Sequence, residues 1–182
     1  MTIQKASPNS ADITVENLEN GNIVIIPTDT LYGFSGIIPD TEDVIYELKN
    51  RPSSKKMIHL IADPYDVYQY TNYNIPPHIF KFWPGAITLI VESKQEEETV
   101  AIRCPGDTWL RDVIKELGRP IYSTSVNKSG QPAMKNILEI ESVFADKVSL
   151  IVSAGNLSNQ PSTIVDLRSD DPVILRRGMV EI

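Results

Sequence analysis

Long apolar runs are missing from this sequence, and none approaches the roughly 20 residues that a membrane-spanning helix needs. The first residues, MTIQKASPNSADIT, lack the apolar segment of a secretory signal peptide. Cys104 is the only cysteine, which excludes an internal disulfide and favours a reducing compartment. We therefore expect a cytoplasmic protein with no membrane partner.

Common signatures of catalysis and nucleotide binding are absent as well. The sequence contains neither a G-x-x-x-x-G-K-[ST] loop nor a G-x-G-x-x-G fingerprint, so a nucleotide would bind without these cradles. It has no G-x-S-x-G elbow, and His59 and His78 have no evident serine partner, which disfavours a serine hydrolase. No cysteine and histidine spacing is typical of metal ligation, so we expect no metal ion held by protein side chains.

Basic residues are few, with 17 Lys and Arg against 24 Asp and Glu and a net charge of −7. A protein that mainly grips a nucleic-acid backbone usually has a broad basic face, because each phosphate needs a counter-charge. Here the basic residues concentrate at 49–56 and 176–177. This distribution favours a small, highly charged ligand such as a nucleotide.

The elements expected from the sequence alternate between helix and strand. The clearest helix is 107–118, which Asp107 can cap and Gly118 can end, with apolar residues at helical spacing between them. The other expected elements are helices at 11–20 (capped by Ser10), 41–50 (capped by Thr41) and 137–145, and strands at 23–26, 57–62, 86–92, 99–103, 120–123, 148–152, 163–167 and 172–176. This pattern predicts an α/β or α+β fold on a mixed sheet, with residues 1–182 forming one domain.

Four polar segments follow or separate the predicted strands, where ligand-binding loops commonly lie. They are PTDTLYG (27–33), KNRPSSKK (49–56), YSTSVNKSG (122–130) and GNLSNQPSTIVDL (155–167). Taken alone, the first is more typical of a simple turn, and the serine-rich third is compatible with a solvated loop. If these hydroxyl groups are functional, we interpret them as binding groups and not as nucleophiles.

The basic segment 49–56 raises the question of its ligand. Lys49 and Arg51 lie at the C-terminal end of a predicted helix, where the helix dipole favours cations without any ligand. That explanation does not account for Lys55 and Lys56, which continue the charge up to the next strand. Arginine offers a planar fork for phosphate oxygens and lysine a mobile point charge, so the segment indicates a triphosphate site.

Seven short motifs occur in a fixed order: PTDTLYG (27–33), KNRP (49–52), FWPGAITL (82–89), VAIR (100–103), STSVNKSG (123–130), PSTIVD (161–166) and LRRG (175–178). Together they resemble the YrdC/Sua5/TsaC family, the L-threonylcarbamoyl-adenylate synthases. Each motif is weak by itself, whereas the ordered set is highly specific. The resemblance covers a core of about 10–182 and is to the short, single-domain form of the family.

The resemblance implies an ATP-dependent condensation. L-Threonine and bicarbonate or CO2 would give a carbamate that attacks the α-phosphate of ATP, forming threonylcarbamoyl-AMP and pyrophosphate. A downstream threonylcarbamoyl transferase complex would then make t6A at adenosine 37 of tRNAs that read ANN codons. The resemblance also implies a twisted mixed sheet flanked by helices around a large positively charged cavity, with Mg2+ accompanying the ATP.

The same resemblance implies two sets of site residues. The ATP-binding residues would be Lys49, Arg51, Lys55, Thr99, Ser125, Asn127 and Arg176. Of these, the catalytic residues would be Lys49, Arg51, Ser125 and Asn127. The L-threonine site would comprise Thr30, Tyr32, Arg103, Ser123 and Ser162, with Arg103 pairing with the substrate carboxylate.

Two rival functions remain open from the sequence. A basic cavity in this fold could accept double-stranded RNA, making the protein an RNA-binding or ribosome-maturation module, although the acidic charge balance argues against RNA binding as more than a weak activity. The other rival is the carbamoyl-adenylate chemistry of hydrogenase maturation factors. Their YrdC-like domains are accompanied by zinc-finger and acylphosphatase segments, of which this sequence shows none.

Overall fold

The structure is a computed structural model that describes residues 1–53, 55–94, 99–169 and 171–182, so Ser54 of the basic segment lies outside the described ranges. The strands are β1 (Thr2–Gln4), β2 (Val24–Pro27), β3 (Tyr32–Ile37), β4 (Ile58–Leu60), β5 (Ile87–Glu92), β6 (Thr99–Arg103), β7 (Ile121–Ser125), β8 (Leu150–Ser153), β9 (Thr163–Asp166) and β10 (Val173–Arg176). The helices are α1 (Ser10–Glu19), α2 (Glu42–Lys49), the 3-10 helix η1 (Pro64–Gln69), α3 (Pro77–Phe80), α4 (Thr108–Leu117) and α5 (Ile137–Phe144).

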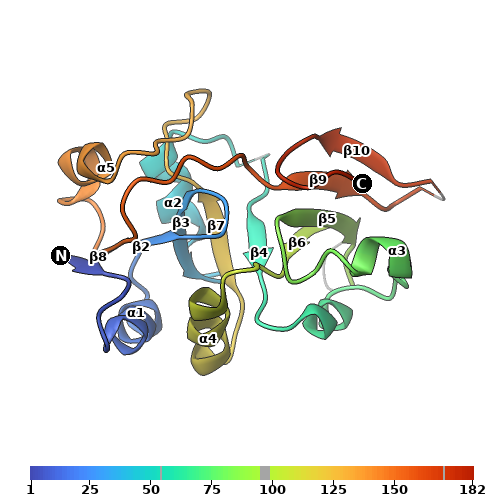
Figure 1. Cartoon of the computed structure of the whole chain (residues 1–182), viewed down its shortest axis with the longest axis horizontal. Helices are drawn as coiled ribbons and strands as arrows, with labels where there is room; N and C mark the ends of the chain where they lie inside the picture. Colours follow the sequence, from blue (N-terminus) through green and yellow to red (C-terminus); the bar gives the residue numbers. More distant parts are fainter. Residues whose placement is uncertain (54, 95–98, 170) are drawn as a thin grey trace.

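The strands of the described ranges form one 10-stranded sheet in the order β1-β8-β2-β3-β7-β4-β6-β5-β9-β10. Five neighbouring pairs are antiparallel and four, including β4–β6 and β5–β9, are parallel. Figure 1 shows α1 and α4 packed together on one side of the sheet and the chain after β8 crossing on the other side to reach β9. The mixed α/β sheet predicted from the sequence is confirmed.

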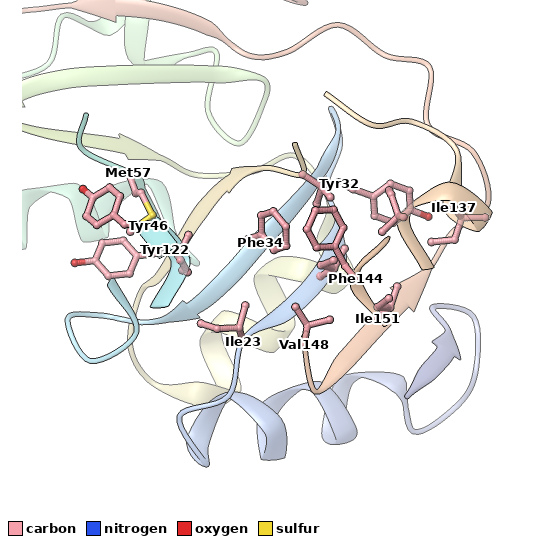
Figure 2. Packing of buried hydrophobic residues seen from close by; sticks show 14 residues of the cluster. Ile23, Tyr32, Phe34, Tyr46, Met57, Tyr122, Ile137, Phe144, Val148 and Ile151 are labelled. Carbon is pink, nitrogen blue, oxygen red and sulfur yellow. The ribbon is translucent and has the colours of Figure 1, made fainter. Parts of the chain in front are cut away.

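The first hydrophobic cluster lies between the sheet and helices α2 and α5. Figure 2 shows Phe34 of β3 facing Phe144 of α5, and their ring centroids lie 5.0 Å apart in an edge-to-face arrangement. Both side chains are almost completely buried, and such burial stabilises the fold by about 1.5–3 kcal/mol for each side chain. This packing fixes α5 and, with it, the C-terminal end of the polar segment that follows β7.

Helix α4 matches its prediction closely. The Asp107 side chain accepts a hydrogen bond from the Leu110 amide at 3.0 Å, and Gly118 ends the helix in the left-handed conformation with φ of 70°. Within the described ranges, no helix is long and apolar enough to cross a membrane.

Two predicted helix caps are wrong. Ser10 is the first residue of α1, and its hydroxyl donates to the Lys5 carbonyl oxygen at 2.6 Å. Thr41 precedes α2 as expected, but its hydroxyl donates backwards to the Ile37 carbonyl oxygen at 2.8 Å and caps no helical amide. The sequence prediction also missed four elements: β1, β3, η1 and α3.

Candidate functional site

A cavity of about 770 Å3 opens on the face of the sheet formed by β4, β5, β6 and β7. Strand alternation explains its floor, because successive side chains of a strand point to opposite faces. Thr99, Ala101 and Arg103 of β6 line the cavity, whereas Val100 and Ile102 pack into a hydrophobic cluster on the other face. Pockets for small molecules commonly measure about 300–1,000 Å3, so the cavity has room for a nucleotide-sized ligand.

The cavity is lined by cations although the protein is acidic overall. The cationic lining residues are Arg51, Lys56, Arg103, Lys135 and Arg176. No carboxylate lines this cavity in the part of the chain that the structure describes. An anionic ligand would therefore be attracted by every charged group on the wall.

Most of the residues predicted for the site lie together in this lining: Thr30, Tyr32, Arg51, Thr99, Arg103, Ser123, Ser125, Asn127, Ser162 and Arg176. Lys49 and Lys55 are not among the residues that line the cavity. In place of Lys55, the next residue, Lys56, reaches the wall and donates to the Thr99 carbonyl oxygen at 3.1 Å.

Lys49 is buried behind the cavity wall, with 1 % of its surface exposed. Its ammonium donates to the carbonyl oxygen of Ser125, to that of Asn127 at 3.1 Å and to the Asn127 Oδ1 at 2.7 Å. Burial, with a smaller contribution from the charge of Arg51, lowers the pKa of Lys49 to about 7. The ammonium group thus contacts the protein interior where the sequence analysis expected phosphate.

The depressed pKa predicts a pH-dependent stability. In the unfolded chain the pKa of Lys49 has its ordinary value of 10.5, so between about pH 7 and 10 the unfolded chain binds more protons than the folded one. The free energy of unfolding should therefore rise with pH across this window, relative to a Lys49→Met variant. Urea denaturation of both proteins at pH 7 and pH 9 measures this, and a difference that does not change with pH would contradict the burial of a titrating amine.

Arg51 lies two residues beyond Lys49 but faces the cavity. Its Nε donates to the Lys55 carbonyl oxygen at 2.9 Å and its NH2 to that of Lys56 at 2.8 Å, which holds the turn between α2 and β4. Within the described ranges these two contacts use two of its five N–H groups, so three N–H donors, two of them on NH1, remain for a ligand. Burial lowers the pKa of Arg51 from its usual value.

Arg103 joins β6 to the turn between β2 and β3. Only 4 % of the residue is exposed. Its NH1 donates to the Thr30 hydroxyl at 3.0 Å, its NH2 forms an ion pair with Asp29, and its Nε donates to the Gly85 carbonyl oxygen at 3.1 Å. Thr30 in turn shares a hydrogen bond of 2.9 Å with the Thr28 hydroxyl. Three of the five guanidinium N–H groups are thus occupied, which leaves two for a substrate carboxylate.

Arg176 and Ser162 form a second polar cluster at this end of the cavity. Arg176 donates through Nε to the Ser162 carbonyl oxygen at 3.0 Å and through NH2 to the Ser162 hydroxyl at 3.1 Å. The Thr88 hydroxyl lies 2.8 Å from that of Ser162. Burial and the neighbouring charge of Arg103 lower the pKa of Arg176. The Ser162 hydroxyl already makes two hydrogen bonds, to Thr88 and Arg176. Its main role is therefore to orient Arg176, and not to bind a ligand directly.

Tyr32 and Ser123 contribute to the cavity in different ways. The Tyr32 hydroxyl donates to the Gly155 carbonyl oxygen at 2.6 Å and accepts from the Ala154 amide at 2.9 Å, while its ring packs in the cluster of Figure 2. Tyr32 therefore supports the wall and anchors the connection after β8. Ser123 of β7 is a diagonal neighbour of Gly33 of β3, where an added Cβ would come within 2.7 Å of the Ser123 Oγ.

We predict that Gly33→Ala destabilises the protein by about 1–3 kcal/mol, because the new methyl group overpacks against Ser123. Urea denaturation measures the loss. Adding Ser123→Ala removes the oxygen that clashes, so the double variant should recover most of the stability. A double variant no more stable than Gly33→Ala would show that the contact with Ser123 is not the cause.

Several lining residues were not predicted as site residues. They include Thr28, Lys56, Thr88, Ala101, Lys135 and Asn159. Strand alternation was a usable signal for Thr88 and Ala101, since each is on the same face of its strand as other cavity residues. Lys135 and Asn159 lie in irregular segments, where no periodicity reveals which way a side chain points.

The fold and the site together define an α/β protein with a cavity lined by cationic side chains. Comparison with known families identifies it further: the Sua5/YciO/YrdC family profile, described as "Telomere recombination", matches residues 16–178. The chain belongs to this family, which confirms the resemblance seen in the sequence.

Solved structures and curated relatives agree with this assignment. The structure of P. abyssi Sua5 complexed with L-threonine superposes with a TM-score of 0.86 at 26% identity, covering 98% of this chain and 57% of that one. E. coli YciO shares the fold, with a TM-score of 0.84 at 22% identity and coverage of 100% and 95%. The Bacillus subtilis threonylcarbamoyl-AMP synthase is 33% identical over 176 residues, 88% of this chain and 51% of the relative. The chain thus spans about half the length of that relative. The Pseudoalteromonas translucida threonylcarbamoyl-AMP synthase is 33% identical over 169 residues, which make up 82% of this chain and 88% of that relative.

Proposed function

We propose that the protein is a threonylcarbamoyl-AMP synthase, a nucleotidyltransferase that converts L-threonine, bicarbonate or CO2, and ATP into threonylcarbamoyl-AMP and pyrophosphate, with water released as well when bicarbonate is the carbon source. The observation that carries this proposal is the convergence of five cationic side chains with the hydroxyl-rich ends of β2, β7 and β9 on one cavity of about 770 Å3. Curated relatives named for this activity, and a homologous Sua5 structure with L-threonine, support it.

The contacts favour placing the ATP phosphates at the end of the cavity that holds Arg51 and Lys56. Arg51 has N–H donors to spare there, and Ser125 and Asn127 of the neighbouring wall line the same space. Thr99 lies beside Lys56, whose ammonium contacts its carbonyl oxygen. Arginine and lysine together suit the clustered negative charges of a triphosphate.

The opposite end favours the carboxylate of L-threonine. Arg103 retains two N–H groups that can donate to a carboxylate. Arg176 lies close enough to Arg103 for the two positive charges to repel each other. A carboxylate bound between or beside them would relieve this repulsion. The hydroxyls of Thr30 and Ser123, which line this part of the cavity, are suited to the amino and hydroxyl groups of threonine. Arg176 also remains our proposed contact to the nucleotide.

The proposed reaction asks the protein mainly for positioning and charge stabilisation. The carbamate oxygen attacks the α-phosphorus, and the bond from that phosphorus to the β-bridging oxygen breaks. Arg51 and Lys56 then stabilise the charge that grows on the departing pyrophosphate. The described lining contains no carboxylate or imidazole that could serve as a general base, so we propose that the threonine amine loses its proton to solvent.

Mg2+ would enter as the complex with ATP. The described cavity wall offers hydroxyl, amide and carbonyl oxygens but no carboxylate, so phosphate oxygens and water would supply its ligands. Its chemistry there is to neutralise phosphate charge. The product would pass to a threonylcarbamoyl transferase complex for t6A synthesis in the cytoplasm.

The test is incubation of the protein with ATP, L-threonine, bicarbonate and Mg2+, followed by mass analysis for the mixed anhydride. We expect threonylcarbamoyl-AMP and pyrophosphate in equal amounts, and neither when threonine or bicarbonate is omitted. ATP turnover without the anhydride would contradict the proposal. A salt-dependent shift of double-stranded RNA without ATP turnover would instead favour the RNA-binding function.

A further inference from the structure

The segment that follows β7 is a thin wall between two hollows. Asn127, Gln131 and Pro132 line both the cavity and a second hollow of about 550 Å3, which Met134 and Phe144 close from the other side. Val126 anchors the start of this segment in the first hydrophobic cluster, whereas Asn127, Gln131 and Pro132 face a hollow on each side. The conformation of 127–131 therefore depends more on specific polar contacts than on packing.

Lys49 supplies these contacts from inside the wall. Its ammonium donates to the carbonyl oxygens of Ser125 and Asn127 and to the Asn127 side chain, and it lies 5.5 Å from the centre of the Phe34 ring. Its own carbonyl oxygen accepts from the Ser129 amide at 2.7 Å. One residue at the end of α2 thus holds the wall through both its side chain and its main chain.

The contact with Lys49 also orients Asn127. The Asn127 Oδ1 accepts from Lys49 at 2.7 Å and from the Ser125 hydroxyl at 2.8 Å, while its Nδ2 donates to the Gln131 carbonyl oxygen at 2.5 Å. An amide with its oxygen facing two donors and its nitrogen facing a carbonyl has one favourable orientation. Lys49 therefore sets the positions of Ser125 and Asn127 and, through Asn127, that of Gln131.

We propose that Lys49 is a positioning residue, which shapes the nucleotide end of the cavity by holding the 125–131 wall and does not itself contact a phosphate. The identity of that ligand rests on the proposed function, whereas the holding role rests on the contacts alone. A lysine ammonium has three N–H donors, and all three meet oxygens of the wall. A direct phosphate contact would require breaking one of them.

The electrostatic surroundings provide a sharp way to test this. Arg51 is the charged group that acts on Lys49, and its other neighbours are the uncharged oxygens of the wall and the Phe34 ring. Burial and Arg51 lower the pKa of Lys49 to about 7, so above this pH the amine loses one of its three N–H groups and with it one contact to the wall. An accessible amine in this state would be unusually reactive toward acylating reagents, and only its burial would protect it.

The first experiment maps acetylation of the wild-type protein at pH 8 with an amine-reactive acetyl ester, by mass spectrometry. Lys81 is the matched reference, because it is exposed and its ammonium also lies over a phenylalanine ring, at 5.2 Å. We expect Lys49 to react at least about tenfold more slowly than Lys81, with or without ATP, because its reaction requires local opening of the wall. Reaction of Lys49 as fast as Lys81 would overturn the proposal, and protection of Lys49 by ATP would then identify it as a direct ligand.

The second experiment compares amide hydrogen exchange in Lys49→Met and Lys81→Met. Loss of the Lys49 contacts should accelerate exchange of 125–131 by about tenfold or more in the free protein, while β5 and β6 keep their protection. Lys81→Met should leave 125–131 unchanged. Unaltered exchange in a Lys49→Met protein that no longer binds ATP would identify Lys49 as a direct ligand and overturn our proposal.

Kinetics separate positioning from a merely structural role. In folded Lys49→Met we expect the KM for ATP to rise several-fold and the KM for L-threonine to stay unchanged. General destabilisation alone would lower Tm and leave both KM values unchanged. If Lys49→Met does not fold, the acetylation of wild-type protein decides the question. Acetylation and exchange need no turnover, so they remain decisive even if threonylcarbamoyl-AMP is not the product.

Discussion

Arg51→Ala should lower the rate of ATP-dependent pyrophosphate release by about 100-fold or more, the usual loss when one preorganised donor to a developing charge is removed. Arg51 lines the cavity and keeps three N–H groups for a ligand, so its removal leaves the leaving group without its principal guanidinium. A pyrophosphate assay at saturating L-threonine measures the effect.

A control separates this effect from unspecific loss of charge. Arg119 is exposed and pairs at 3.8 Å with Asp40, outside the cavity lining. Arg119→Ala should retain wild-type turnover, and circular dichroism should show the same sheet content in both variants. Full turnover by folded Arg51→Ala would show that the phosphates are bound elsewhere.

Arg103→Ala should raise the KM for L-threonine by roughly 10- to 100-fold and that for ATP much less, as expected for one lost hydrogen-bonded charge pair. Arg103 is buried and donates to the Thr30 hydroxyl, and it ends β6, whereas Thr99, which begins β6, accepts from Lys56 at the proposed phosphate site. Initial rates over a matrix of both substrate concentrations measure the two constants. Equal increases in both would contradict a pairing with the threonine carboxylate.

Removing Arg103 also leaves the Asp29 carboxylate without its ion-pair partner, so a second variant is needed. Asp29→Asn keeps the guanidinium and a hydrogen-bond acceptor beside it but removes the charge. We expect a smaller increase in the threonine KM, because Arg103 remains present but is held less firmly. A larger effect than that of Arg103→Ala would show that Asp29 itself binds substrate.

The basic segment shows how far sequence reasoning could go. It located the correct cluster of basic residues. It could not tell that Lys49 is buried while Arg51, two residues later, faces the cavity. The difference comes from Asn50, which adopts the left-handed conformation with φ of 50° and ends α2. The reversal sends Lys49 into the interior and Arg51 toward the cavity. Asparagine commonly adopts this conformation at helix ends, but the sequence analysis extended the helix through residue 50 and did not use that signal.

The sequence predicted the elements whose signals lie within one short segment. It missed those that are defined by hydrogen bonding to strands elsewhere in the chain. Helix α4 has its cap, its glycine and its apolar face within one short segment. Strand β3 contains two glycines and a serine and has no continuous apolar run, and it is a strand because β2 and β7 pair with both of its edges. The same limit applies to the site, since Thr88 and Ser162 meet only after β5 and β9 have paired.

The crossing of the chain between β8 and β9 has a consequence for biosynthesis. Ser162 and Arg176 reach the cavity only when β9 has aligned with β5 and β10 with β9, and these two strands follow all the others along the chain. During synthesis, most of the sheet would therefore have left the ribosome before the end of the cavity proposed to bind L-threonine can form. The nascent protein should acquire its ligand-binding ability late and abruptly, after the bulk of its core has already condensed.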